Sequence, residues 1–216
     1  MPKVKIPRKS TTIDMTAMCD VAFLLLSFFI LATKQKPPEV LAVKTPASVS
    51  SKAVPDKSIL VTLTKEGKVF LMLGDDTKKG AIIDDLNQTR NLQLSPQELA
   101  KLKKTEFIGV PLNQLKQVLN ATTDIPASSL PGIPTDTTNN ELTHWMRSVT
   151  NVYAGGDQKD LEQMLLVKGD GDALYPIFKN IKTAFKANNL MKFRIVTEGE
   201  GVPEGSELWR TGGKEK

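Results

Sequence analysis

The stretch MTAMCDVAFLLLSFFILAT, residues 15–33, decides the architecture of this chain. A helix of this length would be about 28 Å long, which is close to the hydrocarbon thickness of a bilayer. Basic residues flank the stretch on both sides, and Pro37 and Pro38 follow it, where a helix cannot continue. The basic leading segment, residues 1–14, indicates a cytoplasmic N-terminus. The sequence therefore predicts one transmembrane helix over residues 15–33.

Two other interpretations of this stretch stay open. A cleaved signal peptide also places a basic region before an apolar one, and it would leave a secreted soluble protein. The only small-residue cleavage site nearby is Ala32-Thr33, and bulky side chains precede it. A core helix of a soluble protein would rarely hold residues 21–31 with Ser27 as the only polar side chain. An uncleaved anchor fits these residues best.

Asp20 distinguishes this segment from an ordinary membrane anchor. An ionised carboxylate at membrane depth costs at least ~2.5–3.5 kcal/mol, so it must face protein or water, where it can carry a proton. Thr16 at i−4 and Ser27 at i+7 fall on the same helix face, which makes a polar stripe. One helix cannot enclose its own channel, so partner helices must come from other chains. The simpler alternative is that Asp20 lies near the cytoplasmic end and reaches the interface.

Composition and motifs indicate no enzyme. The net charge is +5, from 29 basic and 24 acidic residues scattered along the chain, and this pattern does not favour nucleic-acid binding. Cys19 is the only cysteine and suits a small apolar position, and His144 lacks a nucleophile pattern nearby. The Gly169–Asp172 run lacks the rest of a calcium loop, and we interpret it as a turn before a helix with Asp172 as N-cap. We expect no cofactor and no metal site.

The remainder of the chain predicts a linker followed by an α+β domain. Residues 34–57 hold four prolines and favour an extended linker, and residues 199–216 favour a disordered tail. A domain over residues 58–198 begins with a β-hairpin, and residues 74–160 form a helical insertion, in which Ser95 opens a capping box. The predicted strands are 58–64, 69–73, 165–168 and 193–196, and the predicted helices are 95–103, 112–119 and 141–153. A stripe of Ile177, Ile181, Ala184 and Phe185 predicts a further helix, and residues 122–140 are predicted to be a loop.

The segment around Asp20 resembles the ExbD/TolR family of proton-motive-force transducers. The matching residues are Ile13-Asp14-Met15-Thr16-Ala17-Met18-Cys19-Asp20-Val21, followed by Leu24-Leu25-Leu26. Ala17 stands where the family usually has Pro, but Asp20 stays in register. Weaker likenesses are Val40–Pro46 to a short alternating segment, Leu165–Asp170 to the third strand, Tyr175–Leu190 to the last helix and Lys192–Glu198 to the closing strand.

The resemblance implies a single N-terminal transmembrane helix plus an α+β periplasmic domain, in which a small mixed sheet packs on helices. It implies a single-pass inner-membrane subunit with its C-terminal domain in the periplasm. Two copies would act with an ExbB/TolQ-like multi-span protein and pass motion to a TonB/TolA-like envelope-spanning protein or the cell wall. Asp20 would be the proton-carrying group, with Thr16 and Ser27 on the channel face. The alternative is a membrane-tethered binding or structural module, in which Asp20 only fixes helix register.

Overall fold

A computed structural model describes residues 15–32, 41, 43–49, 54–55, 57–121, 126–154, 158–201, 206 and 210. The chain divides into two compact units, residues 1–39 and residues 40–216, which we call the anchor unit and the α+β unit. The expected cytoplasmic segment, residues 1–14, and most of the expected tail, residues 199–216, lie outside the described residues.

The anchor unit contains helix α1, Met15–Ala32. The helix begins at the predicted residue and ends one residue before the predicted end. None of its residues is buried, and its large apolar side chains are 50–86% exposed. The sequence of α1 contains no Gly or Pro, so nothing interrupts its hydrogen-bond ladder. The helix thus presents apolar side chains on all its sides.

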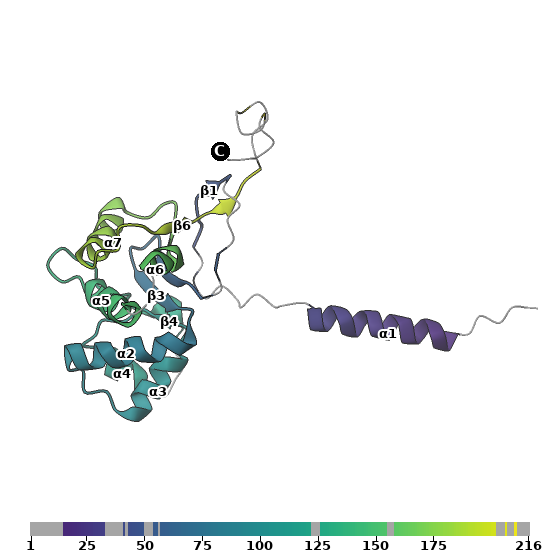
Figure 1. Ribbon diagram of the computed structural model, residues 1–216, viewed down its shortest axis with the longest axis horizontal. Coiled ribbons are helices and arrows are strands. Elements are labelled where there is room, and N and C mark those ends of the chain that lie inside the picture. Colours follow the sequence, from purple (N-terminus) through teal and green to yellow (C-terminus); the bar gives the residue numbers. More distant parts are fainter. Residues whose placement is uncertain are drawn as a thin grey trace, which may run out of the picture. The chain divides into compact units, whose positions relative to one another are not determined.

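The α+β unit is built on a five-stranded mixed sheet with the order β4-β3-β2-β5-β6 (Figure 1). Neighbouring strands β4, β3 and β2 are antiparallel, whereas β2, β5 and β6 are parallel. The strands are β2 Ile59–Leu63, β3 Val69–Leu73, β4 Phe107–Ile108, β5 Leu165–Gly169 and β6 Arg194–Val196. The predicted hairpin and the predicted parallel strand–helix–strand unit are both present. Gly67, at a φ of +83°, forms the hairpin turn, in a conformation that other residues rarely adopt.

The helices include two that the sequence analysis did not predict: α2, which directly follows the hairpin, and α6, which precedes β5. The helices and the 3₁₀ turn are α2 Asp76–Arg90, α3 Pro96–Lys104, α4 Leu115–Leu119, η1 Ala127–Ser129, α5 Leu142–Tyr153, α6 Gln158–Met164 and α7 Tyr175–Ala187. The capping box at α3 is confirmed, because Ser95 Oγ accepts from the Glu98 N–H and Glu98 Oε2 accepts from the Ser95 N–H. The helix expected over 112–119 is shorter, and η1 falls in the expected loop 122–140, of which residues 122–125 are not described.

The main core lies between the sheet and helices α2, α5 and α7. Alternate strand residues point to this side, among them Val61, Leu71 and Val167. On α5 the predicted stripe of Leu142, Trp145, Met146 and Val149 is fully buried here. A smaller cluster collects around Phe70, whose neighbours in β3 belong to the main core, so its ring points to the other face of the sheet.

Part of the expected linker belongs to the α+β unit, which corrects the predicted domain start at residue 58. Leu41 and Val43 are buried in the smaller cluster against Phe70. Strand β1, Ala47–Ser48, pairs in parallel with β7, Glu198–Gly199, so Gly199 is a strand residue, although it lies in the predicted tail. This pairing joins residues about 150 positions apart, and local composition carries no signal for such a contact.

Candidate functional site

Asp20 is the only charged residue of α1 and its sixth residue. At 1.5 Å per residue it lies about 8 Å along the axis from the first residue of the helix. Its side chain is exposed and has no hydrogen-bond or ion-pair partner among the described residues. A carboxylate in this position requires partners from water or from another protein.

Thr16 and Ser27 lie on the same face of α1 as Asp20. At 3.6 residues per turn the three side chains fall within an arc of roughly 40°. Ser27 Oγ donates to the Leu24 carbonyl oxygen at 3.0 Å, so this hydroxyl group is satisfied within the helix and its oxygen can still accept. The predicted stripe therefore exists as a surface of the helix, while its role as a channel face stays a prediction.

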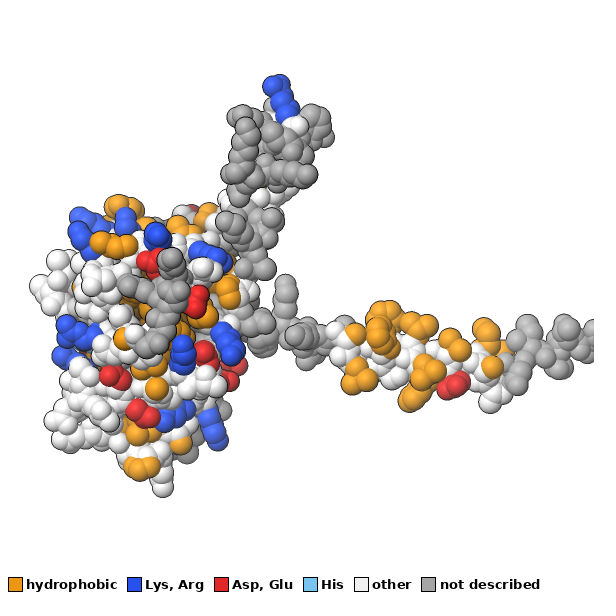
Figure 2. Space-filling view, viewed as in Figure 1, with side chains coloured by type: hydrophobic (Ala, Val, Ile, Leu, Met, Phe, Trp, Pro, Cys, Tyr) orange, Lys and Arg blue, Asp and Glu red, His pale blue; other side chains and the backbone are white. Residues whose placement is uncertain are grey.

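The surface of α1 needs an apolar solvent. Among the described residues, α1 is the one helix that is long and apolar enough to cross a membrane. Figure 2 shows hydrophobic side chains along it. None of its residues is buried, whereas a core helix of a soluble protein is mostly buried, so this exposure favours the membrane span.

His144 lies half-buried on α5. Burial lowers its pKa, Arg90 and Arg147 lower it further, and Glu141 opposes them. The imidazole is therefore neutral at pH 7. Among the described residues, no group of three or more His, Cys, Asp or Glu side chains is placed to hold a metal ion.

Asp170 joins the first segment of the α+β unit, at Lys44, to the loop before α7. Its Oδ2 accepts from the Lys44 N–H at 3.1 Å, and its Oδ1 accepts from the Asp172 N–H at 3.0 Å. These backbone hydrogen bonds, that of Asp172 first, lower the pKa of Asp170. The prediction of Asp172 as N-cap of α7 is wrong: Leu174 occupies that position, and Asp172 pairs with Lys65 at 3.0 Å. Sequence spacing alone does not reveal this role of Asp170, because its partner Lys44 is 126 residues away.

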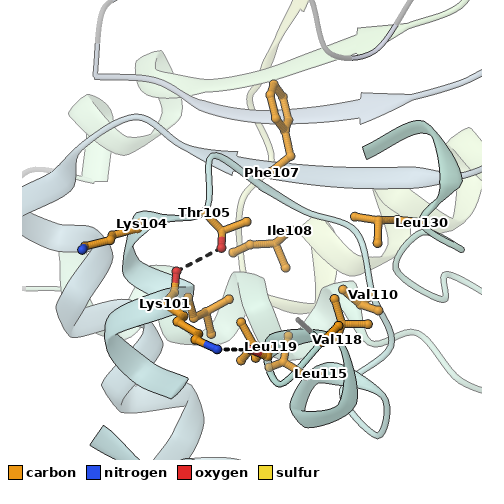
Figure 3. A pocket seen from close by; sticks show the side chains of 12 residues that line it. Lys101, Lys104, Thr105, Phe107, Ile108, Val110, Leu115, Val118, Leu119 and Leu130 are labelled. Carbon is orange, nitrogen blue, oxygen red and sulfur yellow. Dashed lines mark hydrogen bonds between the residues drawn. The ribbon is translucent and has the colours of Figure 1, made fainter. Parts of the chain in front are cut away.

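An apolar groove of about 450 Å³ lies where α3, β4 and α4 meet. Figure 3 shows Lys101 reaching the Leu119 carbonyl oxygen, a contact of 2.8 Å, and Thr105 donating to the Lys101 carbonyl oxygen at 3.0 Å. Its lining residues are Lys101, Leu102, Lys104, Thr105, Phe107, Ile108, Val110, Leu115, Val118, Leu119, Ala121 and Leu130. Most of these described lining residues are apolar, so the groove offers mainly apolar contact.

The comparison with known protein families agrees with the resemblance seen around Asp20. The family model of the biopolymer transport protein ExbD/TolR matches residues 7–200. No curated protein and no solved structure matches the chain. The family match includes α1 together with the α+β unit, so the apolar helix is part of the family's architecture rather than a separate leader. The chain therefore belongs to the ExbD/TolR family of biopolymer transport proteins, as a single-pass membrane subunit that carries an α+β domain.

Proposed function

We propose that this chain is the single-span subunit of a proton-driven energy-transducing complex of the inner membrane, and that Asp20 carries the proton. The observation that supports this most directly is a lone carboxylate on an apolar, fully exposed helix, with no partner among the described residues. A helix that served only as an anchor would be more stable in lipid with Leu or Val at this position. The chain belongs to a family of transport energy transducers, and this supports a role for the carboxylate in energy transduction.

The proposed cycle uses one titratable group in two states. Protonation of Asp20 from the periplasmic side neutralises it, so the carboxyl group can leave its polar contacts and α1 can move against a partner helix. Release of the proton to the cytoplasmic side restores the charge and the contacts. One elementary charge that crosses a potential of ~100 mV supplies about 2.3 kcal/mol, so a few protons can drive a conformational step. Thr16 and Ser27 line the same path and accept or donate hydrogen bonds along it.

The partners follow from the surface of α1 and from the family. A single helix cannot form a channel, so an ExbB/TolQ-like multi-span protein supplies the surrounding helices, and two copies of this chain share it. With the N-terminus in the cytoplasm, the α+β unit lies in the periplasm. There it passes motion to a TonB/TolA-like envelope-spanning protein or to the cell wall.

The test replaces Asp20 by Asn, which keeps the shape of the side chain and removes its proton. We expect Asp20→Asn to copurify with the multi-span partner at wild-type levels but to lose proton flux in membrane vesicles that contain the complex. Asp20→Glu keeps a titratable group and should keep part of the flux. Asp136→Asn makes the same chemical change at an exposed residue of the α+β unit and serves as the matched control.

Full proton flux in an assembled Asp20→Asn complex would sink the proposal. That result would favour the membrane-tethered binding or structural module, in which Asp20 only fixes the register between helices. If Asp20→Asn loses both copurification and proton flux, the result would also support the register role. The Asp20→Glu variant then distinguishes proton carriage from helix register. If Asp20→Glu assembles but its flux does not depend on pH, the carboxyl group does not carry the proton.

A further inference from the structure

One short segment of the α+β unit carries basic residues and no acidic ones. Residues 174–196 hold five basic residues and no acidic residue. This segment alone accounts for the formal net charge of +5, and the other 24 basic residues balance the 24 acidic ones. The segment consists of α7, β6 and the turn between them. It therefore gives this region of the α+β unit a positive potential.

Three of these lysines form a continuous stripe on α7. Lys179, Lys182 and Lys186 follow Tyr175 at spacings of four, seven and eleven residues, so all four side chains fall within an arc of roughly 60°. All four are exposed, and they lie opposite the buried face of α7. We call these four residues the α7 stripe.

The lysines of the α7 stripe differ from several lysines of the α+β unit in having no acidic partner among the described residues. Lys65, Lys103 and Lys192 each pair with a carboxylate, at 3.0, 3.1 and 3.7 Å. Among the described residues, no carboxylate pairs with any lysine of the stripe. An unneutralised row of this kind is suited to an extended anionic surface.

Exposed apolar side chains accompany this charge. Leu174 and Tyr175 are 60% and 65% exposed at the start of α7, and Ile195 is 53% exposed on β6. Ile195 pairs with Val167, which belongs to the main core, so Ile195 lies on the helix side of the sheet, as α7 does. Figure 2 shows hydrophobic and basic side chains next to one another over α7. The combination of lysines, one tyrosine and aliphatic side chains is typical of surfaces that lie on lipid headgroups.

A small apolar hollow lies beside the start of the stripe. It has a volume of about 210 Å³, and its lining includes Tyr175, Phe178 and Ile195. Tyr175 and Phe178 contact each other with ring centroids 6.4 Å apart, and Phe193 lies 6.4 Å from Phe178. Pro46, which lies in the segment that comes from the anchor unit, lines the same hollow. The hollow can therefore hold an apolar group next to the lysines.

Few residues separate this surface from α1 along the chain. The Gly171 N–H donates to the Lys44 carbonyl oxygen at 2.9 Å, so the incoming chain is attached four residues before α7 begins. Between Ala32, the last residue of α1, and Leu41 the chain can extend by at most about 30 Å. The short connection raises the effective concentration of the membrane surface for the start of α7.

We propose that the α7 stripe, together with Leu174 and Ile195, docks the α+β unit on anionic lipid headgroups of the membrane that α1 spans. The lysines contact lipid phosphates, and Tyr175 and Ile195 enter the headgroup layer. Docking holds the α+β unit against the bilayer, and release frees it to reach a partner. This proposal rests on the membrane anchor and is independent of proton transfer at Asp20, so either can fail without the other.

The experiment uses the full chain in nanodiscs with a fluorescent label on α7. Thr183→Cys places bimane next to the stripe in a Cys19→Ala background, and a lipid with a nitroxide headgroup quenches bimane that touches the bilayer surface. We expect strong quenching in nanodiscs that contain phosphatidylglycerol and little in phosphatidylcholine alone. Each lysine strengthens binding to an anionic surface by roughly fivefold, so the triple variant Lys179→Gln, Lys182→Gln, Lys186→Gln should weaken docking on the order of a hundredfold.

The control variant makes the same charge change away from α7. Lys57→Gln, Lys104→Gln and Lys116→Gln remove three exposed lysines and should leave the quenching unchanged. If the α7 variant unfolds, added salt on the unaltered chain gives the same test, because salt screens lysine–phosphate attraction and should abolish quenching.

Three results would overturn the proposal. The first is equal quenching in both lipids, and the second is equal loss in the two triple variants. The third is quenching that does not depend on lipid charge, combined with a change of bimane fluorescence on addition of soluble polyglutamate. That result would assign the stripe to an acidic protein partner instead.

Discussion

Helices α1 and α5 are both rich in apolar residues, yet they place these residues in opposite environments. In α1, apolar side chains surround the helix and are at least half exposed. In α5, Leu142, Trp145 and Val149 lie on one face and are completely buried, and the helix packs against α2 and α7. The pattern around the helix axis, rather than the apolar content, decides whether a helix packs in a protein core or in lipid.

The acidic residues show the same contrast. Asp170 has two backbone N–H partners within its own chain, whereas Asp20 has none among the described residues. A carboxylate in the α+β unit is satisfied when the chain folds, because water and backbone donors are close by. In the proposed function, a carboxylate on α1 is satisfied only when the complex assembles. Stability of the α+β unit and assembly in the membrane should therefore respond to different substitutions.

The largest effect should come from the core side of the comparison. Trp145→Ala leaves a large cavity beneath α5 and should reduce the free energy of unfolding of the α+β unit by about 3–5 kcal/mol. Phe29→Ala, on the lipid-facing side of α1, should leave this free energy unchanged. Chemical denaturation of both full-length variants in detergent micelles measures the difference.

Trp145→Phe is the control for this comparison. It keeps most of the ring and removes the Nε1–H group, which has no hydrogen-bond partner among the described residues. It should lose much less stability than Trp145→Ala. If Phe29→Ala destabilises the α+β unit as much as Trp145→Ala does, then α1 contributes to the stability of the α+β unit, and the contrast between the two helices is wrong.

The next effect concerns the carboxylate in the span. Asp20→Leu should make membrane insertion of α1 more favourable by ~2.5–3.5 kcal/mol, because the insertion cost of the carboxylate disappears. A glycosylation-based insertion assay on the segment measures this change. Ser27→Leu is the comparison, and it should change insertion far less, because Ser27 Oγ already bonds within the helix. Equal insertion of Asp20→Leu and the natural segment would mean that Asp20 lies at the interface.

A smaller effect is expected at the start of α3, where a local signal was read correctly from the sequence. Ser95→Ala removes the hydroxyl group that accepts from the Glu98 N–H, and it should reduce the stability of the α+β unit by about 1 kcal/mol. Ser95→Asp keeps a capping acceptor and should retain most of the stability. Thermal unfolding of the three proteins tests the order, and no loss in Ser95→Ala would show that α3 does not depend on this cap.

The smallest effect should appear as a pH dependence at Asp170. Because its pKa is lowered in the folded state, its stabilisation is present at neutral pH and disappears as the pH falls through the lowered value. Asp170→Asn offers one acceptor oxygen to two N–H donors, so its Tm should lie below that of the natural chain at neutral pH. The gap should close on acidification, whereas Asp136→Asn should show no gap at any pH. A gap that is constant with pH would contradict the role of the Asp170 charge.

Local patterns predicted most of the regular elements of this fold. The hairpin, α3, α5, α7 and the strands beside α7 were all expected, because each carries its own signal: alternation, a capping box or an apolar stripe. Helix α2 was missed since it is mostly polar, contains Gly80, and buries only Ile82, Ile83 and Leu86 together with Lys79. Its helical structure depends on packing against α5, which no local pattern reveals.

The candidate site divides in the same way. Asp20, Thr16 and Ser27 follow from the sequence alone, since helical periodicity fixes which residues share a face. The membrane span itself follows from length and composition, because the bilayer is a uniform apolar solvent. Only the tertiary structure decided that residues 41–48 belong to the α+β unit and that Asp170 holds Lys44. It also decided that Ile195 accompanies α7 on one side of the sheet. The physical reason is distance along the chain: these contacts join segments far apart in sequence, and their energy exists only after the sheet has formed.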